Sequence, residues 1–456
     1  MKKLLACAAL CLSGCVSAPV ENLSTRAQLI ESTLPPMKNF GAASPQRPAM
    51  SNANIAADFL DLHFRLESGR ELPVFTRFEG PITVRVTGAL SPNLLPDLRA
   101  LLVRMQREAG VDISLTSAAE ANVTIEAVSR DDIRRALPHA ACFVVPNVSS
   151  LAEFKRNRRK STTNWALLRE RNRLGIFLPS DSSPQEVRDC LHEELAQAIG
   201  PLNDLYRLPQ SVFNDDNVHT VLTGFDMLIL KASYAPELRT GMSRDEVAAR
   251  LPAILDRLNP AGRGVPVAPI SETPRSWIND VQTALGPGST VAARQRSARA
   301  ALDTAKAMGW EDHRRAFSHY MVGRMSQFSD PDTAKKHFDT ALYYLRRTPG
   351  TELHRAYITT QTSAHALKVG RGDAALQQIA PSLKVAARSQ NAALLSTLML
   401  LQAKALEMTG RVEAARSVRL DSLGWARYGF GADWAVRAKL SEISALGPQG
   451  GGNGGS

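Results

Sequence analysis

Hydrophobic and polar positions alternate along the first half of the chain in a way that predicts strands. In residues 82–87, the apolar side chains Ile82, Val84 and Val86 alternate with polar ones. Other short runs predict four more strands, over residues 112–116, 122–128, 141–148 and 175–179. Each of these segments is short enough to be a strand of one sheet.

Helical spacing appears between the predicted strands. Leucines repeat at this spacing from Leu94 to Met105, and Gly110 stands where a C-cap is expected. Shorter helices are predicted over residues 55–65 and 222–234. A further helix is predicted from Ser183, its candidate N-cap, to Ile199. This mixture predicts an α+β domain over residues 53–258.

After a hinge rich in Pro and Gly at residues 258–274, the strand signal disappears. Ala, Leu and Arg then recur at helical spacing over residues 291–446. Similar short turns precede Ala334, Ala375 and Ala415, which lie 41 and 40 residues apart. This pattern resembles tetratricopeptide repeats, with a period longer than the usual value of about 34. It predicts an all-α helical-repeat domain that binds a protein partner; a plain helical bundle is the alternative.

The N-terminus has the features of a bacterial lipoprotein signal. Two lysines precede an apolar run over residues 4–12, followed by Ser13, Gly14 and Cys15. This end resembles a lipobox, which implies that Cys15 is acylated and becomes the mature N-terminus. The alternative is a plain secretory signal cut elsewhere. Because Val16 is not an aspartate, the resemblance favours the periplasmic face of the outer membrane.

The remaining cysteines bear on the redox state of the exported chain. Cys7 and Cys11 leave with the signal, so that Cys142 and Cys190 are the thiols left in an oxidising compartment. One disulfide can form between them, and two buried free thiols are the alternative. No C-x-x-C spacing remains to suggest a zinc–cysteine site.

The helix predicted to end at Ile199 carries the most informative group of side chains. In the zincin pattern H-E-x-x-H, two histidines four residues apart hold zinc and the glutamate activates water; metzincins add x-x-G-x-x-H. This chain resembles that pattern with its ligands replaced. The residues at the three histidine positions are Glu193, Gln197 and Asn203, while Glu194 and Gly200 keep the residue types of the pattern.

The altered ligands change what the resemblance implies about a metal. Asp204 follows Asn203 and is a further candidate ligand, whereas His192 lies one residue too early for the motif. One carboxylate with neutral amides is expected to hold zinc far more weakly than three imidazoles, so we expect no cofactor. The order of predicted strands and helices is also close to that of a metzincin upper domain. An ordinary core helix, with Glu193 and Gln197 merely solvated, remains the alternative.

A second resemblance covers residues 58–258. Together with Gly200, the residues Glu193, Glu194, Gln197, Asn203, Asp204, Phe213, Asn214 and Asp215 match the pattern of Domain of Unknown Function 2927, a family of proteobacterial lipoproteins. The family has no established activity to carry over. His219 follows this block and is either a replacement ligand or a lone surface histidine.

Composition and charge add little to this picture. The 44% of hydrophobic residues excludes a disordered chain, and 55 Lys and Arg against 44 Asp and Glu give a net charge of +11. The basic run at residues 155–160 is either an exposed loop or a contact with anionic lipid. Without a recognisable nucleic-acid module, we expect no nucleic-acid partner.

The sequence therefore predicts six segments. They are a signal peptide at 1–14, an acylated Cys15 with a flexible tether at 15–52, a zincin-like α+β domain at 53–258, a hinge and linker helix at 259–290, tetratricopeptide-like repeats at 291–446 and a disordered tail at 447–456. The favoured function is a lipid-anchored envelope scaffold with an inactive metallopeptidase-like domain. The alternative is a divergent metallopeptidase in which Glu194 is the general base and zinc is bound by Glu193, Gln197 and Asn203 or Asp204.

Overall fold

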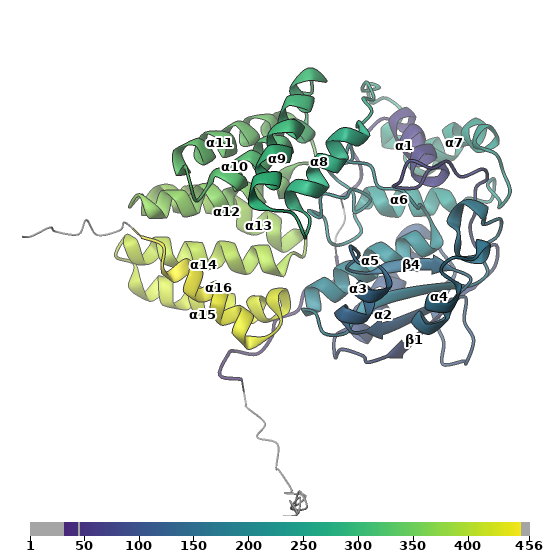
Figure 1. The fold of residues 1–456 in the computed structure, drawn as a ribbon, viewed down its shortest axis with the longest axis horizontal. Coiled ribbons are helices and arrows are strands. Elements are labelled where there is room, and N and C mark those ends of the chain that lie inside the picture. Colours follow the sequence, from purple (N-terminus) through teal and green to yellow (C-terminus); the bar gives the residue numbers. More distant parts are fainter. Residues whose placement is uncertain (1–31, 44–45, 448–456) are drawn as a thin grey trace, which may run out of the picture. The chain divides into compact units, whose positions relative to one another are not determined.

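The computed structural model describes residues 32–43 and 46–447. The predicted signal peptide, the lipidation site Cys15 and nearly all of the glycine-rich tail lie outside these residues. Within them, no helix is long and apolar enough to cross a membrane. From Leu34 onwards the chain forms one compact unit, which contains an α/β region followed by an all-helical region (Figure 1).

The α/β region is built on a five-stranded mixed sheet. Its strands are β1 (Ile82–Gly88), β2 (Ile113–Leu115), β3 (Val123–Val128), β4 (Phe143–Pro146) and β5 (Leu174–Pro179). They are ordered β2-β1-β3-β5-β4, and only β4 runs antiparallel to its neighbour. All five lie within the segments that the sequence predicted as strands, or within one residue of them. Because β4 is last in this strand order, it forms one edge of the sheet.

Helices cover both faces of this sheet. On one face the core joins the strands to α1 (Asn52–Phe64), α2 (Leu94–Arg104), α5 (Pro184–Ile199), α6 (Gly224–Ser233) and α7 (Arg244–Leu258). On the other face a smaller cluster joins β4 and β5 to α3 (Arg130–Ala136) and α4 (Leu151–Asn157). Short helical turns lie at Met105–Ala109, Ser161–Thr163, Trp165–Leu167 and Pro260–Gly262. Alternate side chains of the strands thus enter two cores.

The all-helical region begins with α8 (Arg275–Leu285). It continues through α9 (Val291–Ala307), α10 (His313–Ser326), α11 (Pro331–Arg347), α12 (Glu352–Lys368), α13 (Gly372–Arg388), α14 (Ala392–Met408), α15 (Val412–Phe430) and α16 (Asp433–Ser444). The three recurring turns of the sequence stand where α11, α13 and α15 begin. Their alanines, Ala334, Ala375 and Ala415, are buried, as close helix packing requires. The predicted all-α architecture is confirmed.

Two segments expected to be linkers are instead packed. The linker helix predicted within residues 259–290 is α8, whose Trp277 is fully buried with its ring 5.0 Å from the ring of Tyr206. The last part of the predicted tether lies along α15: the Lys38 amide donates to the Gly424 carbonyl at 3.0 Å, and Phe40 stacks on Trp425. Aromatic contacts hold both segments, through the buried Trp277 and through the partly buried pair of Phe40 and Trp425. This packing corrects the expectation of a flexible tether at its last residues.

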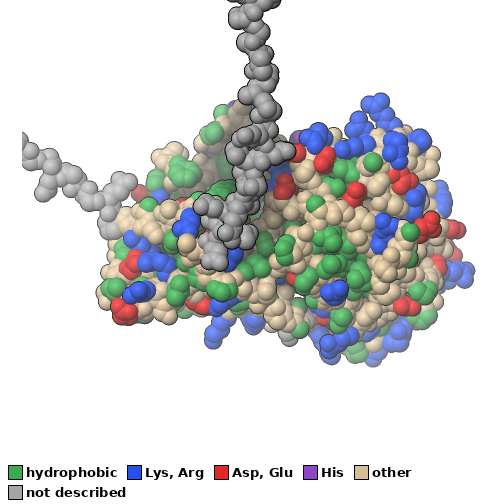
Figure 2. Space-filling model, turned by 90° about the horizontal axis from the view of Figure 1, so that it is seen from below, with side chains coloured by type: hydrophobic (Ala, Val, Ile, Leu, Met, Phe, Trp, Pro, Cys, Tyr) green, Lys and Arg blue, Asp and Glu red, His purple; other side chains and the backbone are tan. Residues whose placement is uncertain are grey.

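Charged side chains do not gather into one basic patch on the face that Figure 2 shows, where Lys and Arg lie among acidic and other side chains. The basic run at 155–160 forms the end of α4 and the following turn, and its charged residues are exposed. Lys155 is within 3.4 Å of Asp132. This placement agrees with the exposed-loop interpretation.

Candidate functional site

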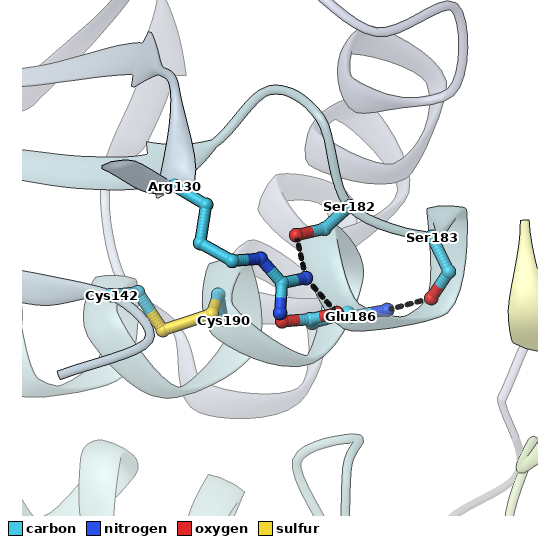
Figure 3. Close-up of a disulfide and its surroundings, with 6 residues drawn as sticks. All are labelled: Arg130, Cys142, Ser182, Ser183, Glu186 and Cys190. Carbon is cyan, nitrogen blue, oxygen red and sulfur yellow. Dashed lines mark hydrogen bonds and ion pairs between the residues drawn. A yellow bond between two sulfur atoms is a disulfide. The ribbon is translucent and has the colours of Figure 1, made fainter. Parts of the chain in front are cut away.

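Helix α5, which carries the motif, is fixed at its start by local hydrogen bonds. Ser183 is the N-cap, and its hydroxyl accepts a hydrogen bond from the amide of Glu186 (Figure 3). Pro184 occupies the first turn, where no amide donor is needed. The Glu186 carboxylate in turn accepts a hydrogen bond from the guanidinium of Arg130 at 2.7 Å. The first turn of α5 is thereby tied to α3.

A disulfide joins α5 to the segment leading into the edge strand. Cys142, next to β4, and Cys190, in the middle of α5, form this bond with their Cα atoms 5.9 Å apart (Figure 3). Cys142 lies on the same side of the strand as Val144, which packs into the core that contains α5. The alternative of two free thiols does not hold in the structure.

The end of α5 is held by a buried arginine. Arg171 is 4% exposed, and its guanidinium donates to the carbonyls of Gln197, Ala198 and Gly200 at 2.6–2.8 Å. These carbonyls belong to the last turn, which has no helical partner for them. Gly200 ends the helix where a Cβ would lie 2.6 Å from Leu230. A larger residue would therefore displace the turn that precedes the rest of the motif.

An open cleft of roughly 510 Å³ lies beside this part of α5. Its walls are the loop after α1, the segment leading into β4, the motif side of α5 and the loop after α5. Five carboxyl groups line it: Glu67, Glu193, Glu194, Asp204 and Asp215. Glu194 is 5% exposed, Glu193 and Asp204 are partly buried, and Glu67 and Asp215 are exposed. The cleft is thus acidic from its interior to its rim.

Burial and mutual repulsion make these carboxyls hard to ionise. Burial, followed by repulsion from Glu67, Asp215 and Asp189, raises the pKa of Glu193 to about 8. The same two causes raise the pKa of Glu194 and of Asp204 well above their usual values. The Asp204 carboxyl forms a hydrogen bond with that of Glu67, which requires a proton on one of them. Several of these groups therefore carry protons at neutral pH.

The structure brings together only part of the predicted metal-ligand set. Glu193, Gln197 and Asp204 line the cleft. Asn203 does not, because its amide donates to the Asp61 carbonyl at 2.9 Å. In residues 32–43 and 46–447, no group of three or more His, Cys, Asp and Glu side chains is arranged to hold a metal ion. Of the residues at the three histidine positions of the metzincin pattern, Glu193 and Gln197 therefore line the cleft and Asn203 does not.

Neither histidine near the motif belongs to the cleft. His192 is buried, and its Nδ1 accepts a hydrogen bond from the amide of Leu222 at 3.3 Å. His219 does not line the cleft, and it is partly buried rather than exposed. It lies beside the buried pair of His354 and Asp216, with its ring 6.2 Å from the ring of His354. Burial lowers the pKa of His219 to about 4, so that it is neutral at pH 7.

Two residues that line the cleft, Asp215 and Glu67, were not predicted as site residues from the sequence. Asp215 belongs to the Phe213-Asn214-Asp215 motif, and its carboxylate accepts a hydrogen bond from the Tyr206 hydroxyl at 3.0 Å. The motif was therefore a signal for it. Glu67 lies in the loop after α1, where nothing in the sequence distinguishes it from other surface glutamates. Only the packing of that loop brings it to the cleft.

The core-helix alternative is correct for one face of α5 only. Leu191, Leu195 and Ile199 are fully buried as it predicted. Gln197 is only 7% exposed, and it lines the cleft rather than facing open solvent. The motif face of α5 is therefore one wall of a cavity.

Comparison with known protein families gives a match to the α/β region. Among individual curated proteins, none is similar enough to match this chain. The matched segment covers residues 52–253, from the start of α1 into α7, and leaves out the all-helical region. These residues include every carboxyl group of the cleft. The predicted resemblance to Domain of Unknown Function 2927 is confirmed, because over these residues the α/β region matches the family described as Protein of unknown function (DUF2927).

Proposed function

We propose that the α/β region binds an extended polypeptide segment in the carboxylate-lined cleft. In this proposal the chain is a lipid-anchored adaptor of the cell envelope, with a metallopeptidase-like domain that has lost its zinc ligands. The observation that carries it is the open cleft of roughly 510 Å³ beside the edge strand β4. An adaptor of this kind needs a site for one partner in each region.

The edge strand supplies the means of binding a peptide. β4 pairs with β5 on one side, and on its other side no strand of the described residues pairs with it. Residues 140–144, which lead into and begin β4, line the cleft. An unpaired strand edge offers backbone donors and acceptors to an added strand, and the neighbouring cavity receives its side chains. An extended segment would thus run along β4 and face α5.

Two further features support the proposal. The strand order, with the motif helix directly after β5, supports a zincin-like relationship that the family match leaves open. In the all-helical region, recurring turns start α11, α13 and α15, as in a tetratricopeptide-like array of helical hairpins. Such arrays bind protein segments, so we assign the second partner to this region.

Anchoring rests on the sequence around Cys15. In cells given a palmitate analogue, the intact protein is expected to become labelled and to fractionate with membranes, because acyl chains contribute about 0.8 kcal/mol per buried CH₂. The Cys15→Ser variant should lose both properties, whereas Cys11→Ser, within the signal, should keep them. A Cys15→Ser protein that remains labelled would exclude this anchor.

Hydrolysis in the same cleft is the second candidate function. The observation that favours it is the buried Glu194 at an open cavity, since carboxyls with raised pKa serve as acid–base groups.

Zinc content distinguishes the two candidate functions. If the protein is an adaptor, we expect elemental analysis of the purified chain to find far less than one zinc per molecule, because carboxylates and amides bind zinc weakly. One zinc per chain that is lost in Gln197→Ala, or peptide hydrolysis abolished in Glu194→Gln, would establish the enzyme instead.

A further inference from the structure

We propose that the cleft selects a basic side chain, a lysine ammonium or an arginine guanidinium, from the segment bound along β4. This inference rests on the proposed function and names the chemistry of its ligand. Three observations carry it: carboxyl groups line the cleft, some oxygen atoms inside the cleft form no hydrogen bond, and the volume of the cleft suits a side chain.

The lining is rich in carboxyl groups and lacks a balancing cation. It contains five carboxyls, and no lysine or arginine among the described residues lines it. The nearby arginines are used elsewhere: Arg171 binds the carbonyls at the end of α5, and Arg275 donates to the backbone carbonyl of Glu67. Arg188 forms a pair with Asp189 on another side of the helix. A cation from outside would therefore meet carboxyl groups that no lysine or arginine of the lining pairs with.

Two carboxyl groups inside the cleft, those of Glu194 and Asp204, have oxygen atoms that accept no hydrogen bond. Glu194 is 5% exposed, and the influences on its pKa are burial and the charges of Glu193 and Glu67, with no hydrogen bond. The Oδ1 atom of Asp204 is buried and forms no hydrogen bond. A buried acceptor without a partner costs about 1–3 kcal/mol. An ammonium or guanidinium donor entering the cleft would satisfy both groups.

The size and shape of the cleft suit a side chain better than a bare ion. Its volume of roughly 510 Å³ holds a long basic side chain together with the backbone beside it. Its apolar lining includes Trp165, Leu66 and Leu202, which can pack against the methylene stem of a lysine. The charged end then reaches Glu193 and Glu194. A guanidinium can also lie against the ring of Trp165.

Repulsion among the carboxyl groups is a further reason for a cation to bind in the cleft. Glu193 faces Glu67, Asp215 and Asp189, while Arg188, Arg275 and the cleft residue His139 are the nearby basic groups. A cation placed among these carboxyl groups would relieve their mutual repulsion.

Matched peptides test the inference on the intact protein. A fluorescein-labelled library of extended host peptides is titrated in sets that differ at one position, which is lysine, arginine, norleucine or glutamate. By fluorescence anisotropy, the lysine and arginine members should bind about tenfold more tightly than norleucine, as one desolvated charge pair allows. Glu193→Gln and Glu194→Gln should reduce this ratio, and Glu120→Gln, an exposed carboxylate outside the cleft, should leave it unchanged.

The outcomes separate this inference from the proposed function. Peptides that bind without preference for a basic residue would overturn the inference and leave peptide binding intact. No binding by any member of the library would overturn the proposed function as well. Calcium chloride alone serves as the competing small cation. If calcium binds tightly and no basic peptide displaces it, the cleft is a metal site and the inference is wrong.

Discussion

Replacing Arg171 with alanine is expected to lower the free energy of unfolding by about 3–5 kcal/mol, measured by urea denaturation at pH 7. The guanidinium donates to three carbonyls at the end of α5 and to the Thr76 hydroxyl at 3.1 Å. Its removal leaves buried acceptors without donors, and hydrogen bonds to a charged group are worth about 1.5–3 kcal/mol each.

The effect of Arg171→Ala should also reach the cleft. Gln197, one of the residues whose carbonyl Arg171 binds, lines the cavity. Arg169→Ala is the matched control, because Arg169 is exposed and lies two residues away on the same loop. We expect Arg169→Ala to change stability by less than about 0.5 kcal/mol. Equal stability of the two variants would show that Arg171 does not hold the end of α5.

Loss of the disulfide is the second change with a large expected effect. The bond between Cys142 and Cys190 closes a loop with a sequence separation of 48 residues. Restricting an unfolded loop of this length is worth up to about 4 kcal/mol, so we expect Cys142→Ser with Cys190→Ser to destabilise the protein by about 2–4 kcal/mol. Thermal unfolding of the wild type should then move toward that of the double variant when dithiothreitol is present.

The disulfide also bears on the proposed peptide binding, because it connects the segment before β4 to α5, two walls of the cleft. Reduction should weaken binding of the library peptides even at a temperature where the chain stays folded. The reduced wild type and the double variant should behave alike, since both lack the same bond. A wild type whose stability is unchanged by dithiothreitol would mean that the bond contributes little in solution.

The positions of the strands and helices were determined largely by local sequence. Alternating apolar residues at 82–87 and other short runs predicted the five strands, and Ser183 with Pro184 predicted where α5 begins. These features depend on periodicity and capping, which act over a few residues. The motif also predicted which side chains share the cleft face of α5, because residues three and four apart on a helix are neighbours. The recurring turns likewise predicted where α11, α13 and α15 begin.

What the sequence left undetermined depends on groups far apart in the chain. Glu67 and Asp215 complete the acidic cleft with Glu193, and Arg171 completes the end of α5, although no spacing rule joins these positions. Asn203 leaves the cleft because the carbonyl of Asp61 accepts its amide proton.

The pairing of such distant groups decides burial, and burial decides whether a carboxyl is an exposed anion or a protonated acid. The sequence by itself determined the sheet, the helices and the family that the α/β region matches. The charge and opening of its cleft were decided only in the tertiary structure, because desolvation and repulsion depend on distances in space.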